Sequence, residues 1–382
     1  MRNYDYAELN SVIGEELYEA LLLDGYISLM SDIDLRVYPH TLIKEQLRCF
    51  DGELRAACEL FCLGRRVSLR SLSEGLRDAA LKLEPSGIVR TLGESICTSS
   101  LSLYVIQGLL YFAETPGPLI SLYYGEDSIA LATRLDLLRP LRGKVLDLCS
   151  GPGIQGILAA ALGCDVTAVE INPVAASVAR CNATLNGCVE KYCVVEASID
   201  DFFSSKSVGV YNRVYANPPL VPVPEGMPYA LVGAGGVDGL KITRSIIGHA
   251  CDILAPGGEL ITIGLSGGNE HGPYVADAVD SIVSQTPLRA VLSVLSRCPV
   301  AAGSKWLDLI TRSVDGYALE RGYSEPHEVM SAYHSAGISE VYSFALTLIA
   351  PACTEKGEQV HGLHRYIDLS DAQYDGIRWW LE

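Results

Sequence analysis

Basic residues are scarce in this chain: among its 382 residues are 29 lysines and arginines but 46 aspartates and glutamates, a formal net charge of −17. Proteins that act on nucleic acid usually neutralise phosphates with a basic surface. The best local basic segment is LGRRVSLRSL, at residues 63–72. Because the overall acidic field repels a polyanion, the composition predicts that nucleic acid is not a partner.

Long apolar runs are also missing. The longest ones, such as Ile261 to Leu265, are far shorter than the roughly 20 residues that a membrane helix needs. The first ten residues, MRNYDYAELN, contain no apolar signal segment. We therefore expect the mature protein to start here, to have no membrane partner and to be cytoplasmic.

Paired cysteine and histidine motifs are absent. The 12 cysteines include no C-x-x-C pair, which favours reduced thiols over a disulfide framework. Cys58 and Cys62 are spaced to share one helix face and are expected in a core. The seven histidines have no metal-ligand spacing, and His361 and His364 lie in a polar tail. No metal site is predicted.

The N-terminal third has a helical pattern. Apolar residues recur every three or four positions between residues 4 and 93, and two or three short strands are expected within residues 95–114. Residues 1–120 are therefore predicted to form a mostly helical, winged-helix-like domain that serves as a substrate lid or a dimerisation element, which would allow a homodimer. Tyr4 and Tyr6 are its exposed candidates for substrate contact.

From residue 121 the pattern alternates between strands and helices. The expected strands are KVLDLCSG, DVTAVEIN, RVYANPP and ELITIGL, and IQGILAAALG and PVAASVARCNATLNG are expected helices. Such alternation is typical of a parallel α/β sheet. We predict a Rossmann-like, doubly wound sheet in residues 121–350, closed by antiparallel strands. A polar tail with Trp379 and Trp380 follows in residues 351–382.

A glycine loop follows the first of these strands, in VLDLCSGPGIQG at residues 145–156. Gly151 and Gly153 let the backbone approach a ligand at a helix N-terminus, and the loop alone fits either a dinucleotide or another nucleoside cofactor. Asp147, before the loop, would repel a pyrophosphate but suits a cationic amino-acid group. Glu170, at the end of the next strand, suits ribose hydroxyls. Together they favour S-adenosylmethionine (SAM) over NAD.

Four motifs in this order, DLCSGPG, VEINP, SIDD and NPPL, resemble the class I SAM-dependent methyltransferases. NPP followed by GGVDGLKI resembles the branch that methylates planar nitrogens, which includes release-factor glutamine methyltransferases and small-domain RNA base methyltransferases. The resemblance covers about residues 121–290 and implies SAM as the cofactor, with S-adenosylhomocysteine as the product.

The resemblance also implies which residues bind the cofactor. Asp147, Ser150, Gly151 and Gly153 would line the methionine part, and Glu170, Ile171 and Asn172 the ribose and adenine. Three groups complete the predicted site: Ser198, Ile199 and Asp200 near the adenine; Tyr124, Asp127 and Ser128 in a covering segment; and Asn217 beside the transferred methyl group. Ordinary packing is the alternative for Tyr124.

The stretch YANPPLVPVP, at residues 215–224, supplies the predicted acceptor site. Proline biases the residue before it toward extended geometry, so Asn217 is pinned at a strand end. In the resembled branch, the equivalents of the Asn217 side chain and the Pro218 carbonyl accept hydrogen bonds from a substrate NH₂ group. The position that is usually aromatic is Leu220 here, which weakens the case for a nucleobase.

The loop at residues 220–239 is expected to cover the acceptor, with Tyr229 as a catalytic candidate. Glu225 and Asp238 are polar candidates there, with ordinary solvated loop residues as the alternative. The sequence favours methyl transfer to a nitrogen of a small, biosynthetic molecule. A protein glutamine, an RNA base and a non-catalytic SAM-binding regulator remain as alternatives, and a carbon or oxygen acceptor is also open.

Overall fold

The computed structural model describes residues 4–33, 39–116, 122–134, 141–205, 208–315, 325–352 and 364–370. They divide into two compact units, one from Met1–Ala132 with Ser150–Glu196 and the other from Thr133–Cys149 with Ala197–Glu382. The predicted boundary at residue 120 and the tail residues His361, Trp379 and Trp380 lie outside the described residues. The predicted domain limits therefore stay predictions.

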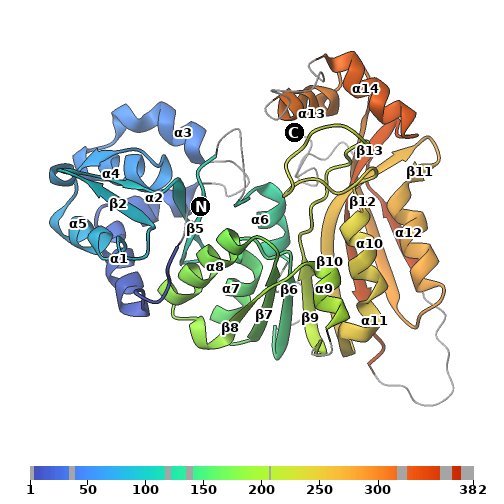
Figure 1. Cartoon of the computed structure of the whole chain (residues 1–382), viewed down its shortest axis with the longest axis horizontal. Helices are drawn as coiled ribbons and strands as arrows, with labels where there is room; N and C mark the ends of the chain where they lie inside the picture. Colours follow the sequence, from blue (N-terminus) through green and yellow to red (C-terminus); the bar gives the residue numbers. More distant parts are fainter. Residues whose placement is uncertain are drawn as a thin grey trace. The chain divides into compact units, whose positions relative to one another are not determined.

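Helices dominate the start of the first unit, as the apolar spacing predicts (Figure 1). They are α1 (Ser11–Leu23), α2 (Tyr26–Asp32), α3 (Pro39–Gln46), α4 (Gly52–Ala57), a π-helical turn (Cys58–Cys62) and α5 (Glu74–Leu81). Short 3-10 turns lie at Leu47–Cys49 and Leu69–Ser71. Ser73 caps α5 by accepting the Leu76 N–H at 3.2 Å. Cys58 and Cys62 are buried, as expected.

Five short strands accompany these helices. β1 (Val67–Ser68), β2 (Val89–Leu92) and β3 (Ser95–Thr98) form a sheet of order β1-β3-β2, and β4 (Leu101–Ile106) pairs with β5 (Leu109–Glu114). The three strands within residues 95–114 match the prediction, whereas β1 and β2 lie in the region predicted helical. The prediction that Tyr4 is exposed is wrong: the apolar ring is buried, and its hydroxyl is satisfied by donating to the Ser99 carbonyl at 2.9 Å.

The rest of the first unit alternates between helices and strands. It contains α6 (Glu126–Ala132), α7 (Ile154–Ala161), β7 (Asp165–Glu170), α8 (Pro173–Leu185), a 3-10 turn (Val189–Lys191) and β8 (Tyr192–Glu196). β7 and β8 run parallel, with Glu170 opposite Glu196. The sequence did not predict β8, because YCVVE has neither a long apolar run nor a clear alternation of buried and exposed residues.

The second unit is built on a mixed sheet of order β14-β12-β13-β10-β9-β6. Its strands are β6 (Lys144–Leu148), β9 (Tyr211–Ala216), β10 (Leu254–Asn269), β11 (Gly272–Pro273), β12 (Arg289–Pro299), β13 (Glu340–Ile349) and β14 (His364–Asp368). β6, β9 and β10 are parallel neighbours, and β13 is antiparallel to β10 and β12. The antiparallel closing pair was predicted.

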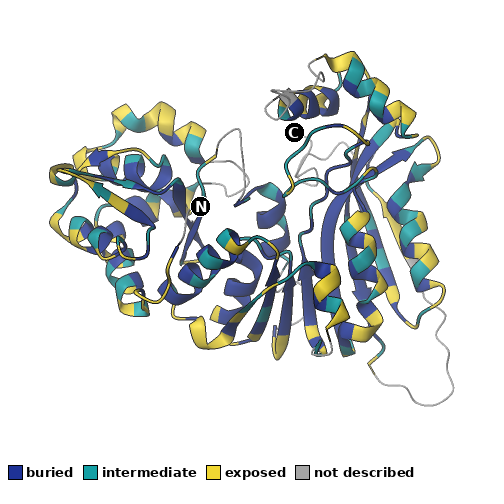
Figure 2. Cartoon of the chain, viewed as in Figure 1, coloured by how far each residue is buried: buried dark blue, intermediate teal, exposed yellow. Residues whose placement is uncertain are grey.

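Six helices flank this sheet in the described part of the second unit: α9 (Ile199–Ser204), α10 (Lys241–Gly248), α11 (Ala250–Ile253), α12 (Tyr274–Val283), α13 (Lys305–Asp315) and α14 (Pro326–Ser335). The strands are buried, and the helices expose their outer faces (Figure 2). The predicted Rossmann-like α/β fold with a helical N-terminal region is confirmed.

Within the described segments, no helix is both long enough and apolar enough to cross a membrane. In the same segments, no three His, Cys, Asp or Glu side chains are grouped as a metal site would require.

Candidate functional site

The glycine loop between β6 and α7 leaves open space for a ligand. Gly151 has φ +54°, and a Cβ built there would meet only the Tyr123 carbonyl oxygen, at 3.9 Å. Gly153 has φ +96°, and its Cβ would lie 2.4 Å from the Tyr192 hydroxyl. Gly153 therefore cannot be replaced without a shift, whereas the space over Gly151 is free for a bound group.

Glu170, at the end of β7, braces this loop. Its Oε2 accepts the Gly151 N–H at 2.7 Å, and its Oε1 accepts the Asn172 N–H at 2.7 Å. Burial raises the pKa of the Glu170 carboxyl, against the lowering effect of the N–H groups of Asn172, Gly151 and Ile171. Each carboxylate oxygen has two lone pairs, so both oxygens can also accept from ribose hydroxyls.

Ser150 provides the test of whether a cofactor fits. Its hydroxyl is buried and has no hydrogen-bond partner among the described residues, while its N–H donates to Val169 at 3.1 Å. A buried polar atom without a partner is costly unless a ligand or water supplies one. The Ser150 hydroxyl, the open backbone at Gly151 and the Glu170 carboxylate fit the predicted nucleoside cofactor.

The covering segment is fixed to the same loop region. The Tyr123 hydroxyl donates to Asp127 Oδ1 at 2.8 Å, and Gln155 of α7 donates to the Ser128 carbonyl at 3.0 Å. Asp127 and Ser128 are buried. The Tyr124 ring packs 4.2 Å from the Tyr104 ring, centroid to centroid. The contact of Tyr124 with the cofactor stays a prediction beside this packing role.

Asn172 and Ile171 follow Glu170 directly. Asn172 caps α8 by accepting the Val174 N–H at 3.0 Å. Ile171 is 61% exposed, an unusual state for an isoleucine at the end of a buried strand. An apolar side chain left free beside Glu170 suits one face of an adenine.

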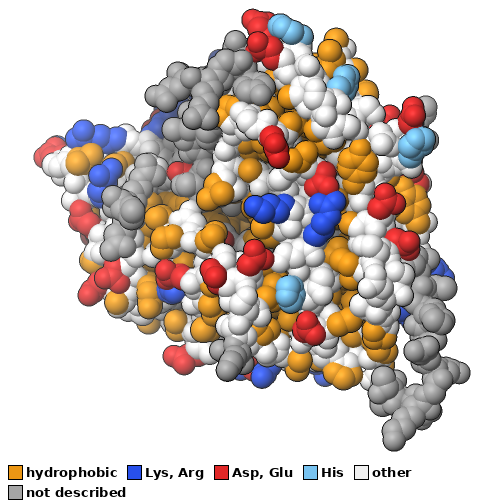
Figure 3. All heavy atoms as spheres, turned by 45° about the vertical axis from the view of Figure 1, so that its right-hand side comes forward, with side chains coloured by type: hydrophobic (Ala, Val, Ile, Leu, Met, Phe, Trp, Pro, Cys, Tyr) orange, Lys and Arg blue, Asp and Glu red, His pale blue; other side chains and the backbone are white. Residues whose placement is uncertain are grey.

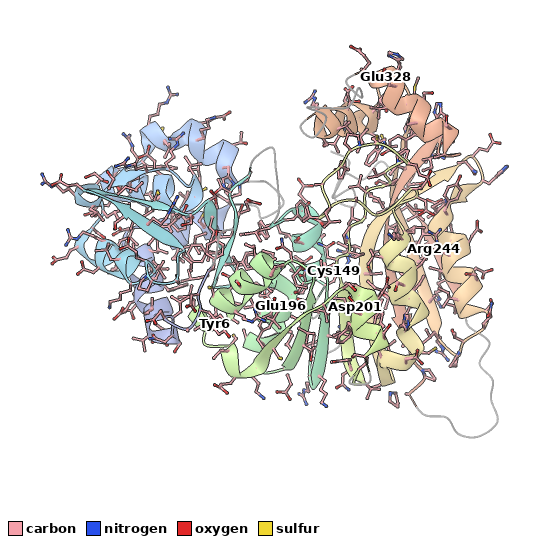
Figure 4. The ribbon with its side chains drawn as sticks, viewed as in Figure 1. Tyr6, Cys149, Glu196, Asp201, Arg244 and Glu328 are labelled. Carbon is pink, nitrogen blue, oxygen red and sulfur yellow. The ribbon has the colours of Figure 1, made fainter. Side chains whose placement is uncertain are left out.

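In the second unit, Asp147 and Cys149 precede the loop. Asp147 is buried on β6, opposite Tyr215 of β9. Cys149, labelled in Figure 4, has φ +57°, a conformation that costs a non-glycine residue energy. The chain thus enters the glycine loop through a strained residue, and strained backbone is concentrated at functional sites.

The residues predicted near the adenine lie at the start of α9. Ser198 caps the helix by accepting the Asp201 N–H at 3.0 Å. Ile199 is buried, and the exposed Asp200 accepts a hydrogen bond from Ser245 of α10 at 2.8 Å. The Asp200 carboxylate therefore already joins two helices, and its cofactor role stays a prediction.

Asn217 comes directly after β9, and Pro218, next to it, is buried. The Asn217 N–H donates to the Leu148 carbonyl at 3.4 Å, and Thr262 donates to the Ala216 carbonyl at 2.9 Å. The backbone before the two prolines is therefore held from both neighbouring strands. The backbone at Asn217 is thus anchored at the strand end, and the binding of an acceptor by its amide stays a prediction.

The loop after Pro219 folds on itself. Val221 donates to Gly233 at 2.8 Å, and Gly235 donates to Val221 at 2.9 Å. Leu220 is buried in an apolar cluster with residues of α13 and α14, and half-buried Tyr229 packs against the same cluster. We call this the α13–α14 cluster; its core is Leu220, Val221, Met227, Leu265, Cys298, Val300, Trp306, Leu307, Ile310, Val314, Val329, Tyr333, Ile338 and Val341.

The two charged loop candidates differ in their surroundings. Asp238 accepts two hydrogen bonds from Arg244, at 3.0 and 2.5 Å, and one from the Leu240 N–H at 3.1 Å. Its carboxylate therefore fixes the loop to α10, where Figure 4 labels Arg244. Glu225 is exposed.

Sequence reasoning missed two buried polar groups, one in each unit. Asn182 of α8 contacts the glycine loop, and Tyr333 of α14 donates to the Pro222 carbonyl at 2.5 Å. Asn182 had a detectable signal, since it interrupts the apolar face of PVAASVARCNATL. Tyr333 had none, because its partner is 111 residues away in sequence.

Residues 124–278 match the model of the methyltransferase small domain. The curated relatives include a release factor glutamine methyltransferase of Deinococcus radiodurans, 33% identical over 33% of this chain and 47% of that protein. Another is a ribosomal protein uL3 glutamine methyltransferase of Bradyrhizobium diazoefficiens, 32% identical over 44% of this chain and 55% of that protein. The chain spans about half the length of the curated relatives it matches.

Among solved structures, the tRNA m1G37 methyltransferase of M. jannaschii matches at 15% identity and a TM-score of 0.36, over 66% of this chain and 57% of that one. The predicted partners need correction. The named substrates of the curated relatives are a release factor and a ribosomal protein. These protein substrates contradict the predicted partners, which were a small molecule and no nucleic acid.

Proposed function

We propose that the protein methylates the side-chain amide nitrogen of a glutamine in a protein substrate. The premise is that residues 124–278 form a class I, SAM-dependent methyltransferase domain. The residues that would hold SAM are Asp147, Ser150, Gly151 and Glu170, with Ile171 against the adenine. When bound, SAM supplies a methyl group whose C–S bond breaks as the amide nitrogen forms the new N–C bond and loses a proton to solvent.

One observation carries the proposal. Asn217 directly follows β9, its N–H donates to the Leu148 carbonyl, and two prolines follow it in the sequence. The Asn217 side-chain oxygen and the Pro218 carbonyl would accept the two N–H groups of a glutamine amide. Because an amide nitrogen shares its lone pair with the carbonyl, fixing its orientation contributes more than a strong base would.

Leu220 supports an amide acceptor. It takes the position that is aromatic in the resembled branch, and it is buried in the α13–α14 cluster. Position 220 therefore offers no aromatic ring that could stack on a flat base. A glutamine side chain does not need such stacking. Tyr229, half-buried at the edge of the cluster, is proposed to contact the substrate chain.

The N-terminal residues, about 1–120, are proposed to recognise the protein substrate. Release factors and ribosomal proteins act where proteins are synthesised, so the proposal includes a cytoplasmic location. Nitrogen is the proposed methylated atom because the proposed acceptor is a glutamine amide.

The test supplies methyl-labelled SAM to a ribosomal protein extract, to total RNA and to a metabolite extract, and locates the label by mass spectrometry. We expect it on a glutamine side chain. Asn217→Ala should lower the rate about a hundredfold and leave SAM affinity within about twofold. Glu225→Ala, in the same loop but exposed, is the control and should retain its rate. Label only in RNA or metabolites, or full activity of Asn217→Ala, would refute the proposal.

A further inference from the structure

Asn182 lies in the middle of α8 and is completely buried. Asparagine lowers helix propensity, because its amide competes for backbone hydrogen bonds, and a buried amide is costly unless it is paired. The buried helix neighbours that lie three or four positions from it are apolar, including Val178, Ala179 and Leu185. An amide at this position therefore requires specific partners.

The Asn182 side chain makes three hydrogen bonds, to backbone groups of two segments that are distant in the sequence. Asn182 Oδ1 accepts the Phe112 N–H at 2.8 Å, and its Nδ2 donates to the Phe112 carbonyl at 2.9 Å. The same Nδ2 donates to the Pro152 carbonyl at 3.1 Å. One amide thus joins strand β5 of the N-terminal hairpin to the glycine loop, because Pro152 lies between Gly151 and Gly153.

Asn186, four residues further along the chain, repeats only the first part of this pattern. It accepts the Leu110 N–H at 3.0 Å and donates to the Leu110 carbonyl at 2.7 Å. Four residues of helix rise about 6 Å, close to the roughly 6.6 Å that separates alternate residues of a strand. The two asparagines therefore pair with the free edge of β5, whose other edge pairs with β4.

The packing of α1 on α8 supports the same attachment. A Cβ built on Gly14 of α1 would lie 1.9 Å from the Leu185 carbonyl oxygen, so the two helices are in backbone contact. The N-terminal helices and hairpin are therefore both fixed to α8, near the end that carries Asn182 and Asn186.

We propose that Asn182 is a positioning residue for the cofactor loop, which it holds in register with the N-terminal hairpin through the Pro152 carbonyl. The proposal rests on the SAM site of the proposed function. A loop held at Pro152 keeps the Gly151 N–H on Glu170 and the space over Gly151 open. Binding at the loop is thereby coupled to the order of β5, in the part of the chain proposed to recognise the substrate.

The test compares Asn182→Ser with Asn186→Ser. Both remove two hydrogen bonds to β5, but only the first removes the bond to Pro152. We expect Asn182→Ser to weaken SAM binding at least tenfold by calorimetry, and Asn186→Ser to change it less than twofold. Amide hydrogen exchange should accelerate at Phe112 and at Gly153 in Asn182→Ser, but only around Leu110 in Asn186→Ser.

Equal affinity losses in the two variants, or unchanged affinity in Asn182→Ser, would overturn the proposal and leave Asn182 a purely structural residue. Asn182→Thr, which keeps more of the side-chain volume, is the second variant should Asn182→Ser not fold. If the wild-type protein does not bind SAM, the proposed function fails instead. The exchange rate at Gly153 without cofactor then still decides whether Asn182 holds the loop.

Discussion

Glu170 combines two opposing demands on one carboxyl group. It accepts hydrogen bonds from Gly151 and Asn172 most strongly when ionised, but it is 8% exposed, and burial raises its pKa. Its titration therefore begins at a higher pH than that of an ordinary glutamate, whose pKa is 4.5. A raised pKa favours the protonated form in the folded protein, so this carboxyl's contribution to stability is lost as pH rises through that value.

SAM affinity should therefore fall as the pH is lowered toward the raised pKa of Glu170, because the protonated carboxyl loses acceptor strength. Calorimetric titration between about pH 8 and pH 5 measures this. Glu170→Gln should bind SAM more weakly than the wild type, by about 1.5 to 3 kcal/mol, and this affinity should depend little on pH. Glu196→Gln alters the residue opposite it on β8, which is exposed and paired with Arg180, and should keep the wild-type profile. If SAM affinity depends on pH in Glu170→Gln as it does in the wild type, another group causes that dependence.

Single positions show how far sequence motifs reach. The places of Gly151, Gly153, Glu170 and Asn217 at strand ends and in the glycine turn followed from motif order, because these are local features, while their roles in a site stay predictions. The positive φ of Cys149 was not predictable, since nothing in the side chain requires it. The ion pair of Asp238 with Arg244 was not predictable either, because the sequence pattern of a loop carboxylate is the same whether it faces a substrate or a neighbouring helix.

The α13–α14 pair is the element that holds the acceptor loop. Buried Tyr333 donates to the Pro222 carbonyl, and burial, followed by the nearby Tyr229, raises the pKa of its hydroxyl, which therefore stays a donor at neutral pH. The loop residues Leu220, Val221 and Met227 also pack in the apolar α13–α14 cluster. The Tyr333 hydroxyl is thus a directional contact between α14 and the loop that follows Asn217 and the two prolines.

Tyr333→Phe should lower the free energy of unfolding by about 1 to 3 kcal/mol, because a buried carbonyl loses its donor. It should lower the methyl-transfer rate more than the SAM affinity, since the loop supports the acceptor. Thermal unfolding, calorimetry and single-turnover rates separate these effects. Tyr274→Phe is the matched control: its hydroxyl donates to Gly337 at 2.7 Å at the edge of the same cluster, away from the loop. Equal rate losses in both variants would contradict the assignment.

Elements with strong periodicity were predictable, and elements defined by partners were not. α1, α7, α8, β7 and β9 follow from apolar spacing and glycine or proline signals. β2 and β8 are short, and they exist because β3 and β7 pair with them. The packing of α13 and α14 on the acceptor loop depends on contacts across about a hundred residues, which a local pattern does not encode.

The whole chain is strongly acidic. The basic segment at residues 63–72, the best local candidate, is largely neutralised: Arg65 pairs with Glu59, and Arg70 with Glu94. Acidic side chains are spread over the face seen in Figure 3, with basic ones among them. Ribosomal proteins lie against RNA phosphates and are commonly basic, so opposite charges would steer such a substrate toward this protein.

The KM for a protein substrate should therefore rise roughly tenfold between low and physiological salt, because screening removes the steering. The KM for SAM should change little over the same range, since the groups proposed to hold it, the Ser150 hydroxyl and the Glu170 carboxylate, are buried and therefore weakly screened by salt. Steady-state kinetics at several sodium chloride concentrations measure both. A protein-substrate KM that is insensitive to salt would show that contacts other than charge select the partner.

The division of the chain into two units has a consequence for its synthesis. The unit with the glycine loop, Glu170 and the Asn182 bridge is complete in sequence at Glu196, before β9 and Asn217 have been made. At about 5–20 residues per second, Asn217 follows Glu196 within roughly 1 to 4 seconds, whereas β13, which ends at Ile349, is complete only after roughly 8 to 30 seconds. The nascent chain thus contains the whole glycine-loop unit before β10 and β13 are available to complete the sheet in which β9 places Asn217.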